Sequence, residues 1–272
     1  MPKNYDAYTL KMIAIIGMAM QHTALVLGSV IPVALHFPLQ FGGGFTFPIM
    51  ALLLVEGYRY TKDIKKYATR LFVFALISQI PHMMSLGMVL DFGANFFGGN
   101  IMFTLFAGLV ILYLHDNMKK RALFWVLFIL ISLVTLTCDW GLIGPIMILL
   151  YHIVSNEKLK RTIVPALAFW FNIFAGIVIG IVIGFTAAFA DPEVITGLAE
   201  AGVDIDVGVA EALAGLLFPV GMLASIPFIR GYNGERGKSM KYMFYAFYPL
   251  HLLILGVLAY VLGINASLFP WQ

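Results

Sequence analysis

Long apolar stretches alternate with short basic segments along the 272 residues of this chain. A run of roughly 20 apolar residues is long enough to cross a bilayer, so the stretches predict about nine membrane-spanning helices. Three of the runs are short, as expected for tilted or half-buried helices. We expect an all-α, polytopic transmembrane bundle that forms one domain over residues 1–272. The predicted spans lie near Tyr8–Leu35, Phe45–Gly57, Leu71–Met88, Ile101–Leu114, Ala122–Thr137, Gly141–Ile153, Ile163–Ala190, Val207–Ile229 and Tyr242–Gly263.

The composition supports this class of protein. Hydrophobic residues make up 61% of the chain and charged residues 11%, whereas a soluble domain has about 25% charged residues. The mean hydropathy is +0.93. These values indicate an integral membrane protein that is embedded in a lipid bilayer.

The basic residues predict an orientation. If the N-terminus lies inside and the loops alternate, all 17 Lys and Arg residues fall on the inner side, as the positive-inside rule requires. The acidic residues of the 191–206 loop then lie outside. We therefore expect a cytoplasmic N-terminus in a bacterial plasma membrane. Because topology accounts for the cations, the sequence pI of about 8.9 does not indicate nucleic-acid binding.

Two histidines are predicted to lie deep in the bilayer. Lys11 and His22 are about three helical turns apart, so they share a face and stand roughly 16 Å apart along the axis. His251 lies roughly 15 Å beyond Lys241 in the last span, at a similar depth. Each histidine is either packed against a backbone carbonyl or a functional group in a wet cavity. The two can meet only if the first and last helices touch.

The charged residues at the inner end of the second span admit two interpretations. Glu56 and Arg59 are three residues apart on one helix face, where they can form an ion pair. The basic hairpin from Arg59 to Arg70 either serves topology alone or binds phosphates that arrive from the cytosol.

Polar residues at the outer ends of the middle spans are also candidates. Asn100 and Thr104 are four residues apart and share a helix face, and Asp139 lies in the next outer turn. Side chains of this kind either cap helices and bond neighbouring helices or take part in catalysis.

Several separated motifs follow one another along the chain. They are Leu10–His22, Phe47-Pro48, Leu54–Thr61, Lys66–Leu71, Ile77–Pro81, Asn100 with Phe103–Phe106, Asp139-Trp140-Gly141, Tyr232–Gly237 and Phe244–His251. Through these motifs the chain resembles the TraX family, whose namesake N-acetylates the pilin of conjugative pili, and the basic residue eleven positions before His22 is similar to the signature of polytopic membrane acyltransferases. The family usually has an acid just before the first-helix histidine, where this chain has Gln21, and an arginine before Phe47-Pro48, where it has Gly42-Gly43-Gly44.

The resemblance implies an acetyltransferase that moves acetyl from cytosolic acetyl-CoA to an amine or hydroxyl of a peptide, pilin or surface-glycan acceptor. His22 would be the general base, since the pKa of histidine lies near neutrality. Asn100 or His251 would bind the oxyanion or orient the base. The acyl-CoA donor would be held by Lys11, Glu56, Arg59 and Arg70. The alternative is a non-enzymatic transporter or scaffold with a proton-linked His/Glu site.

Overall fold

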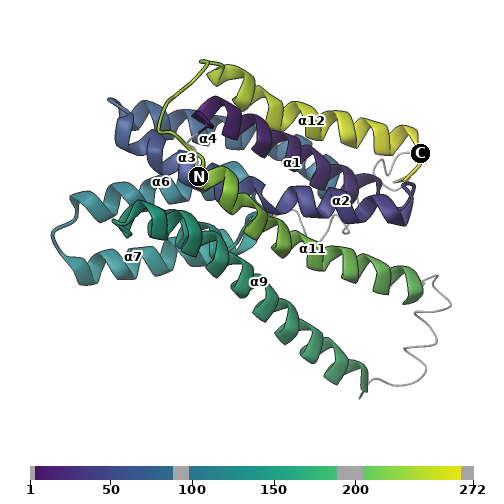
Figure 1. Cartoon of the computed structure of the whole chain (residues 1–272). Coiled ribbons are helices and arrows are strands. Elements are labelled where there is room, and N and C mark those ends of the chain that lie inside the picture. Colours follow the sequence, from purple (N-terminus) through teal and green to yellow (C-terminus); the bar gives the residue numbers. More distant parts are fainter. Residues whose placement is uncertain (1–3, 88–97, 189–204, 265–272) are drawn as a thin grey trace.

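The computed structural model describes residues 4–87, 98–188 and 205–264. These residues form helices and two isolated β-bridges, and they include no strand (Figure 1). The all-α prediction is therefore confirmed for the described part of the chain. The α-helices are α1 (Ala7–Leu27), α2 (Val33–Gly44), α3 (Thr46–Tyr60), α4 (Ile64–His82), α6 (Ile101–Asn117), α7 (Arg121–Val134), α8 (Ile143–Ile153), α9 (Glu157–Ala188), α11 (Ile205–Arg230) and α12 (Lys241–Val261).

Each predicted span overlaps a helix, but several limits differ: α4 begins at Ile64 rather than Leu71, and α9 begins at Glu157 rather than Ile163. The first two spans differ more. The first ends at Leu27 rather than Leu35, because the turn through Pro32 interrupts it and a residue before proline disfavours the α conformation. A separate helix, α2, then leads into α3, so the second span is not short. Residues Ala34–Tyr60 together give 27 residues of apolar helix.

Among the described residues, four segments are long and apolar enough to cross a membrane: Ala7–Leu27, Ala34–Tyr60, Glu157–Val178 and Tyr242–Val261. The shorter apolar helices are α6, α8, the α7 region and the second half of α11. These helices support the prediction of a membrane protein. The count of about nine crossings and the cytoplasmic N-terminus stay predictions.

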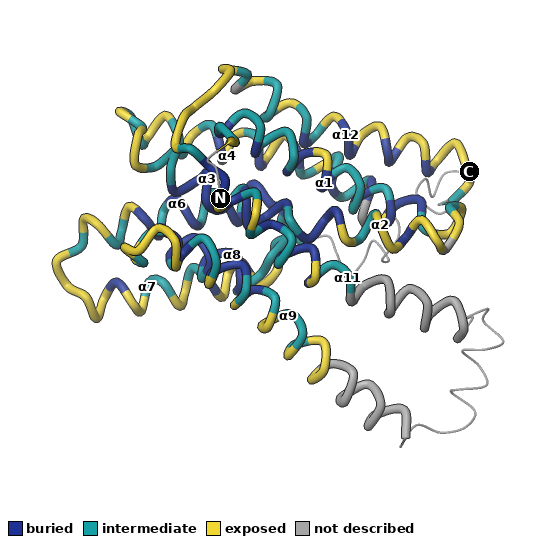
Figure 2. The backbone as a smooth tube through the Cα atoms, viewed as in Figure 1, coloured by how far each residue is buried: buried dark blue, intermediate teal, exposed yellow. Residues whose placement is uncertain are grey.

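The core lies around α3 and the inner face of α1 (Figure 2). Phe47 and Val55 of α3 and Leu10 of α1 have no exposed surface. In contrast, α7 and α9 carry large apolar side chains that point outward, among them Trp125 and Trp170, which are 49% and 65% exposed. An outer surface of this kind suits contact with lipid rather than water.

The start of α1 is held against the loop that precedes α12. Tyr5 N donates to Gly231 O at 3.0 Å, and Asn233 N donates to Tyr5 O at 2.9 Å. Asp6 then caps α1 by accepting from Thr9 N at 2.7 Å, and this bond lowers the pKa of the Asp6 carboxyl. These bonds hold the start of the loop against the N-terminal residues, and α1 and α12 begin together and run side by side (Figure 1).

The connections lie at two ends of the bundle. Figure 1 shows the α3–α4, α6–α7 and α11–α12 connections at one end, and the α1–α2 turn and the end of α12 at the other. The basic segments therefore lie together at one end, which we call the basic end. This grouping is what the predicted alternation of loops requires, while most of the acidic 191–206 loop lies outside the described residues.

Candidate active site

The packing of α1 against α12 brings His22 and His251 together. His22 Nδ1 lies 2.7 Å from His251 Nε2, and the two rings are nearly parallel with centroids 5.0 Å apart. Both residues are buried, with 7% and 9% of their surface exposed. The two histidines that the sequence placed at matching depth thus form a hydrogen-bonded dyad.

The hydrogen bonds assign the protons of the neutral dyad. His251 Nδ1 lies 2.8 Å from Phe247 O, and a carbonyl oxygen only accepts, so His251 Nδ1 carries the proton. His251 Nε2 is then the acceptor and His22 Nδ1 the donor of the 2.7 Å bond. The proton of His22 is therefore on Nδ1, and its Nε2 keeps a free lone pair.

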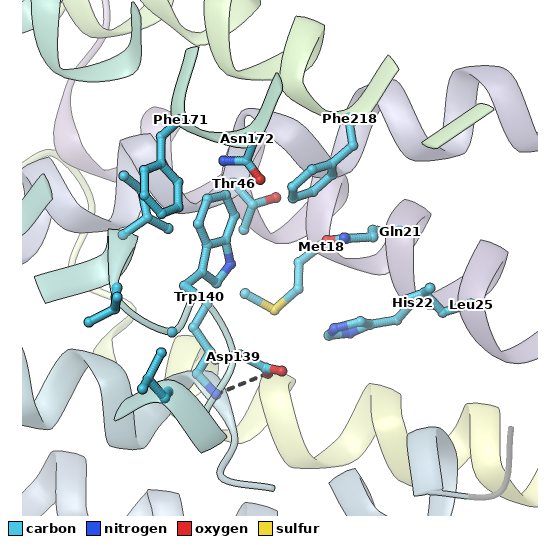
Figure 3. Close-up of a pocket in the computed structure, with 15 residues that line it drawn as sticks. Met18, Gln21, His22, Leu25, Thr46, Asp139, Trp140, Phe171, Asn172 and Phe218 are labelled. Atoms are coloured by element: carbon cyan, nitrogen blue, oxygen red, sulfur yellow. Dashed lines mark hydrogen bonds between the residues drawn. The ribbon is translucent and has the colours of Figure 1, made fainter. Parts of the chain in front are cut away.

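His22 lines a cavity of about 400 Å³. Figure 3 shows its ring pointing from α1 towards the side of the cavity that holds Asp139 and Trp140. The wall is mainly apolar, and Gln21, Thr46 and Asn172 add polar groups. His251 is not part of the wall, so it supports His22 from behind. The other lining residues are Met18, Leu25, Ile101, Leu136, Gly141, Leu142, Ile143, Phe171 and Phe218.

A second polar group lies beside the dyad. Tyr248 Oη is 3.4 Å from both His82 Nδ1 and Asp139 Oδ2, and the last two atoms are 3.9 Å apart. The ring of Tyr248 lies 5.6 Å from that of His251. His82 is also buried, although it lies in the last turn of α4. The signal for Tyr248 was its place three residues before His251, in the same motif.

Comparison with known proteins now places the chain. It matches the family described as TraX protein over residues 6–259. The chain belongs to the TraX family. It is 32% identical over 172 residues to a Dichelobacter nodosus protein named probable fimbrial assembly protein FimC, serogroup H1, and this match covers 61% of the chain and 69% of that protein. No solved structure matches the chain.

The positions where this TraX chain differs from the usual family pattern lie next to each other. A Cβ on Gly43 would come 2.5 Å from Gln21 Cβ, and a Cβ on Gly44 would collide with Phe218 O. The glycines therefore let α2 approach α1 and α11 closely, as small residues do in membrane helix pairs. Gln21 lines the cavity beside His22, and the bond to His22 Nδ1 comes from His251.

Asn100 is placed apart from the dyad. Its amide nitrogen donates to Ala75 O at 2.8 Å and to Gln79 Oε1 at 2.9 Å, and its oxygen accepts from Met102 N at 3.0 Å. The side chain is fully buried and does not line the cavity. These bonds favour the interpretation that Asn100 caps α6 and ties it to α4.

Asp139 also has a capping role. Its carboxylate accepts from Ile101 N at 3.1 Å, which is the contact drawn in Figure 3. The expected cap is thus present, but it serves the start of α6 from the α7–α8 turn. The same carboxylate lines the cavity that His22 lines, so Asp139 also brings an acidic group to the site.

The predicted donor-binding residues fall into two sets. Lys11 Nζ lies 5.3 Å from the ring of Phe244, near the start of α12, and the Arg70 guanidinium acts electrostatically on Tyr245, the next residue of that helix. Within the described residues, neither cation lies within 4 Å of a carboxylate. Both therefore have charge available for an anion at the basic end of α12.

Arg59 and Glu56 lie in another environment. Arg59 Nη1 is 3.3 Å from Glu56 Oε1 and 3.7 Å from Glu157 Oε1. The ion pair between positions 56 and 59 is thus present, and it extends to the start of α9. Because its charge is already compensated, Arg59 is a weaker candidate for phosphate binding than Lys11 or Arg70.

Proposed function

We propose that this TraX-family chain is a membrane-embedded acetyltransferase. One observation carries the proposal: the chain of bonds from Phe247 O through His251 to His22 leaves a lone pair on the Nε2 atom of a buried, cavity-lining imidazole. A group of this kind is suited to take a proton from a nucleophile near neutral pH. The relative is named a fimbrial assembly protein. This name supports a pilin or another surface molecule as the acceptor of the acetyl group.

In the proposed reaction, His22 Nε2 accepts the proton of an acceptor amine or hydroxyl as that group attacks the thioester carbonyl of acetyl-CoA. The new bond joins the acceptor atom to the acetyl carbon, and the carbon–sulfur bond breaks. The proton then passes from His22 to the leaving CoA thiolate. His251 holds the His22 ring in place throughout, and it also accepts the hydrogen bond of the transient imidazolium.

The donor is proposed to enter from the basic end. Lys11 and Arg70 would bind its phosphates, since neither is paired with a described carboxylate. The acetyl group would extend along α12 towards the dyad. This route requires that the protein lies in the bacterial plasma membrane with its basic end in the cytosol. Asn100 has no free amide hydrogen to bind an oxyanion, so the proposed site is formed without it.

Purified protein in lipid vesicles tests the proposal. Labelled acetyl-CoA is supplied on one side, and CoA release is followed with a thiol reagent in the presence of fimbrial-subunit peptides or surface saccharides. We expect acceptor-dependent release and label on one acceptor class. Absence of thioester cleavage with every acceptor, together with proton-coupled uptake of a solute, would instead favour a carrier.

A further inference from the structure

A second histidine cluster lies far from the dyad in sequence, at the ends of three helices. His115 Nδ1 and His152 Nε2 approach the same atom, Asp116 Oδ1, at 2.9 and 2.8 Å. The other carboxylate oxygen, Asp116 Oδ2, accepts from Tyr58 Oη at 3.0 Å. The two histidine nitrogens and the carboxylate oxygen all lie within 4.8 Å of one another. Three potential ligand atoms therefore converge on one point.

The helix termini favour a positive charge at this point. Tyr58 lies in the last turn of α3, His115 and Asp116 in the last turn of α6, and His152 in the last turn of α8. The C-terminus of a helix carries a partial negative charge from its unpaired carbonyls. Three such ends meet here beside a carboxylate, so a cation is stabilised from several directions.

We propose that His115, Asp116 and His152 bind a divalent transition-metal ion, with zinc as the expected ion. Imidazole and carboxylate are ligands that zinc accepts, at about 2.0–2.2 Å. An ion between the three atoms would replace the two hydrogen bonds, with small movements of the side chains. Tyr58 would hold the carboxylate from behind, as partners of metal-bound carboxylates commonly do.

The exposure of the ligands fits an accessible ion. The side chains of His152, His115 and Asp116 are 13%, 24% and 38% exposed. The cluster is therefore half-buried and open on one side, so a water molecule can supply the fourth ligand. The ion would join α6 to α8 at one end of the bundle. This site does not depend on acetyl transfer by the His22–His251 dyad.

Metal binding is tested on the full-length chain in detergent, with any histidine tag removed. The protein is dialysed against zinc chloride, and bound zinc is measured by atomic emission; cobalt chloride gives the ligand-field spectrum of a tetrahedral site. We expect one ion per chain and a higher Tm with zinc, because a ligand that binds only the folded state stabilises it. Asp116→Asn should weaken zinc binding at least tenfold, and Tyr58→Phe by about 10–100-fold.

Matched variants separate this site from other histidines. His36→Gln and His22→Gln should retain the bound ion, and Tyr113→Phe, on the same helix as His115, should bind zinc like the parent. The proposal is overturned if the parent takes up no zinc, or if Asp116→Asn and the parent bind it equally. It is also overturned if the Tm responds to pH through this cluster but not to zinc, since the two histidines would then share a proton instead.

Discussion

The two histidine clusters of this protein contain the same side chain in opposite electrostatic settings. In the dyad, His22 is bonded to another imidazole, more than one turn before the end of α1. In the second histidine cluster, His115 and His152 share a carboxylate where three helices end. We propose that the first setting provides a neutral base with a free lone pair and that the second binds a cation. The bonding partner, more than the burial, therefore decides what each histidine can do.

Short of removing the base itself, the largest effect is expected at His251. His251→Phe removes the acceptor for His22 Nδ1, so His22 loses its fixed tautomer and orientation. Turnover should fall by roughly 10–100-fold, as for other orienting partners of a functional histidine, with little change in acetyl-CoA affinity. In His251→Gln the amide oxygen can still accept, so this variant should recover part of the rate.

Steady-state kinetics in vesicles measure both variants beside the parent, with Tm as the check on folding. Equal loss in His251→Phe and His251→Gln, with both proteins folded, would show that His251 does more than accept a hydrogen bond. A normal rate in His251→Phe would remove its orienting role and, with it, the contrast between the two clusters.

A smaller effect is expected for the cations. Lys11→Ala or Arg70→Ala should weaken acetyl-CoA binding by about 1–3 kcal/mol, which is typical of a hydrogen bond to a charged group. Arg59→Ala is the matched control, because Arg59 is already paired with two carboxylates. Titration with acetyl-CoA and with dephospho-CoA measures the difference. If Arg59→Ala weakens binding more than Arg70→Ala, the proposed phosphate site is in the wrong place.

Asn100 should affect stability and leave the chemistry almost unchanged. Asn100→Ala leaves Met102 N without its cap and breaks the link to α4, at a cost of about 1–3 kcal/mol. Asn117→Ala, at the exposed end of the same helix, is the control and should change the Tm little. Thermal unfolding and turnover are measured on each variant. A folded Asn100→Ala protein that binds acetyl-CoA but turns over 100-fold more slowly would indicate that Asn100 has a catalytic role.

The sequence predicted well how deep the two histidines of the dyad lie in the bundle. Helical rise fixes how far a residue lies along its own helix, so His22 and His251 could be placed at one level. Hydropathy gave the helical class, and the separated motifs gave the family. The capping position of Asn100 also follows from local chain geometry, because it bonds the amide two residues on, whereas Asp139 caps α6 from a distant turn.

Neighbours around the bundle could not be predicted in this way. Nothing in the spacing of α1 shows that it contacts α12 rather than another helix. The contact between His22 and His251 could therefore be predicted only on the condition that these two helices touch. For the same reason His82 and His152, whose partners lie on other helices, were not among the predicted site residues. The turn at Pro32, which ends the first helix early, was not predicted because hydropathy does not detect a short turn inside a continuous apolar run.

The acetyl-transfer rate of His22→Gln tests the central claim most directly. The parent, His22→Gln and the control His36→Gln are reconstituted at equal folded yield and given saturating acetyl-CoA and acceptor. The account predicts that His22→Gln binds acetyl-CoA like the parent but transfers acetyl about 10²–10⁴ times more slowly, while His36→Gln keeps the parent rate. A well-folded His22→Gln protein that transfers acetyl at the parent rate would contradict it.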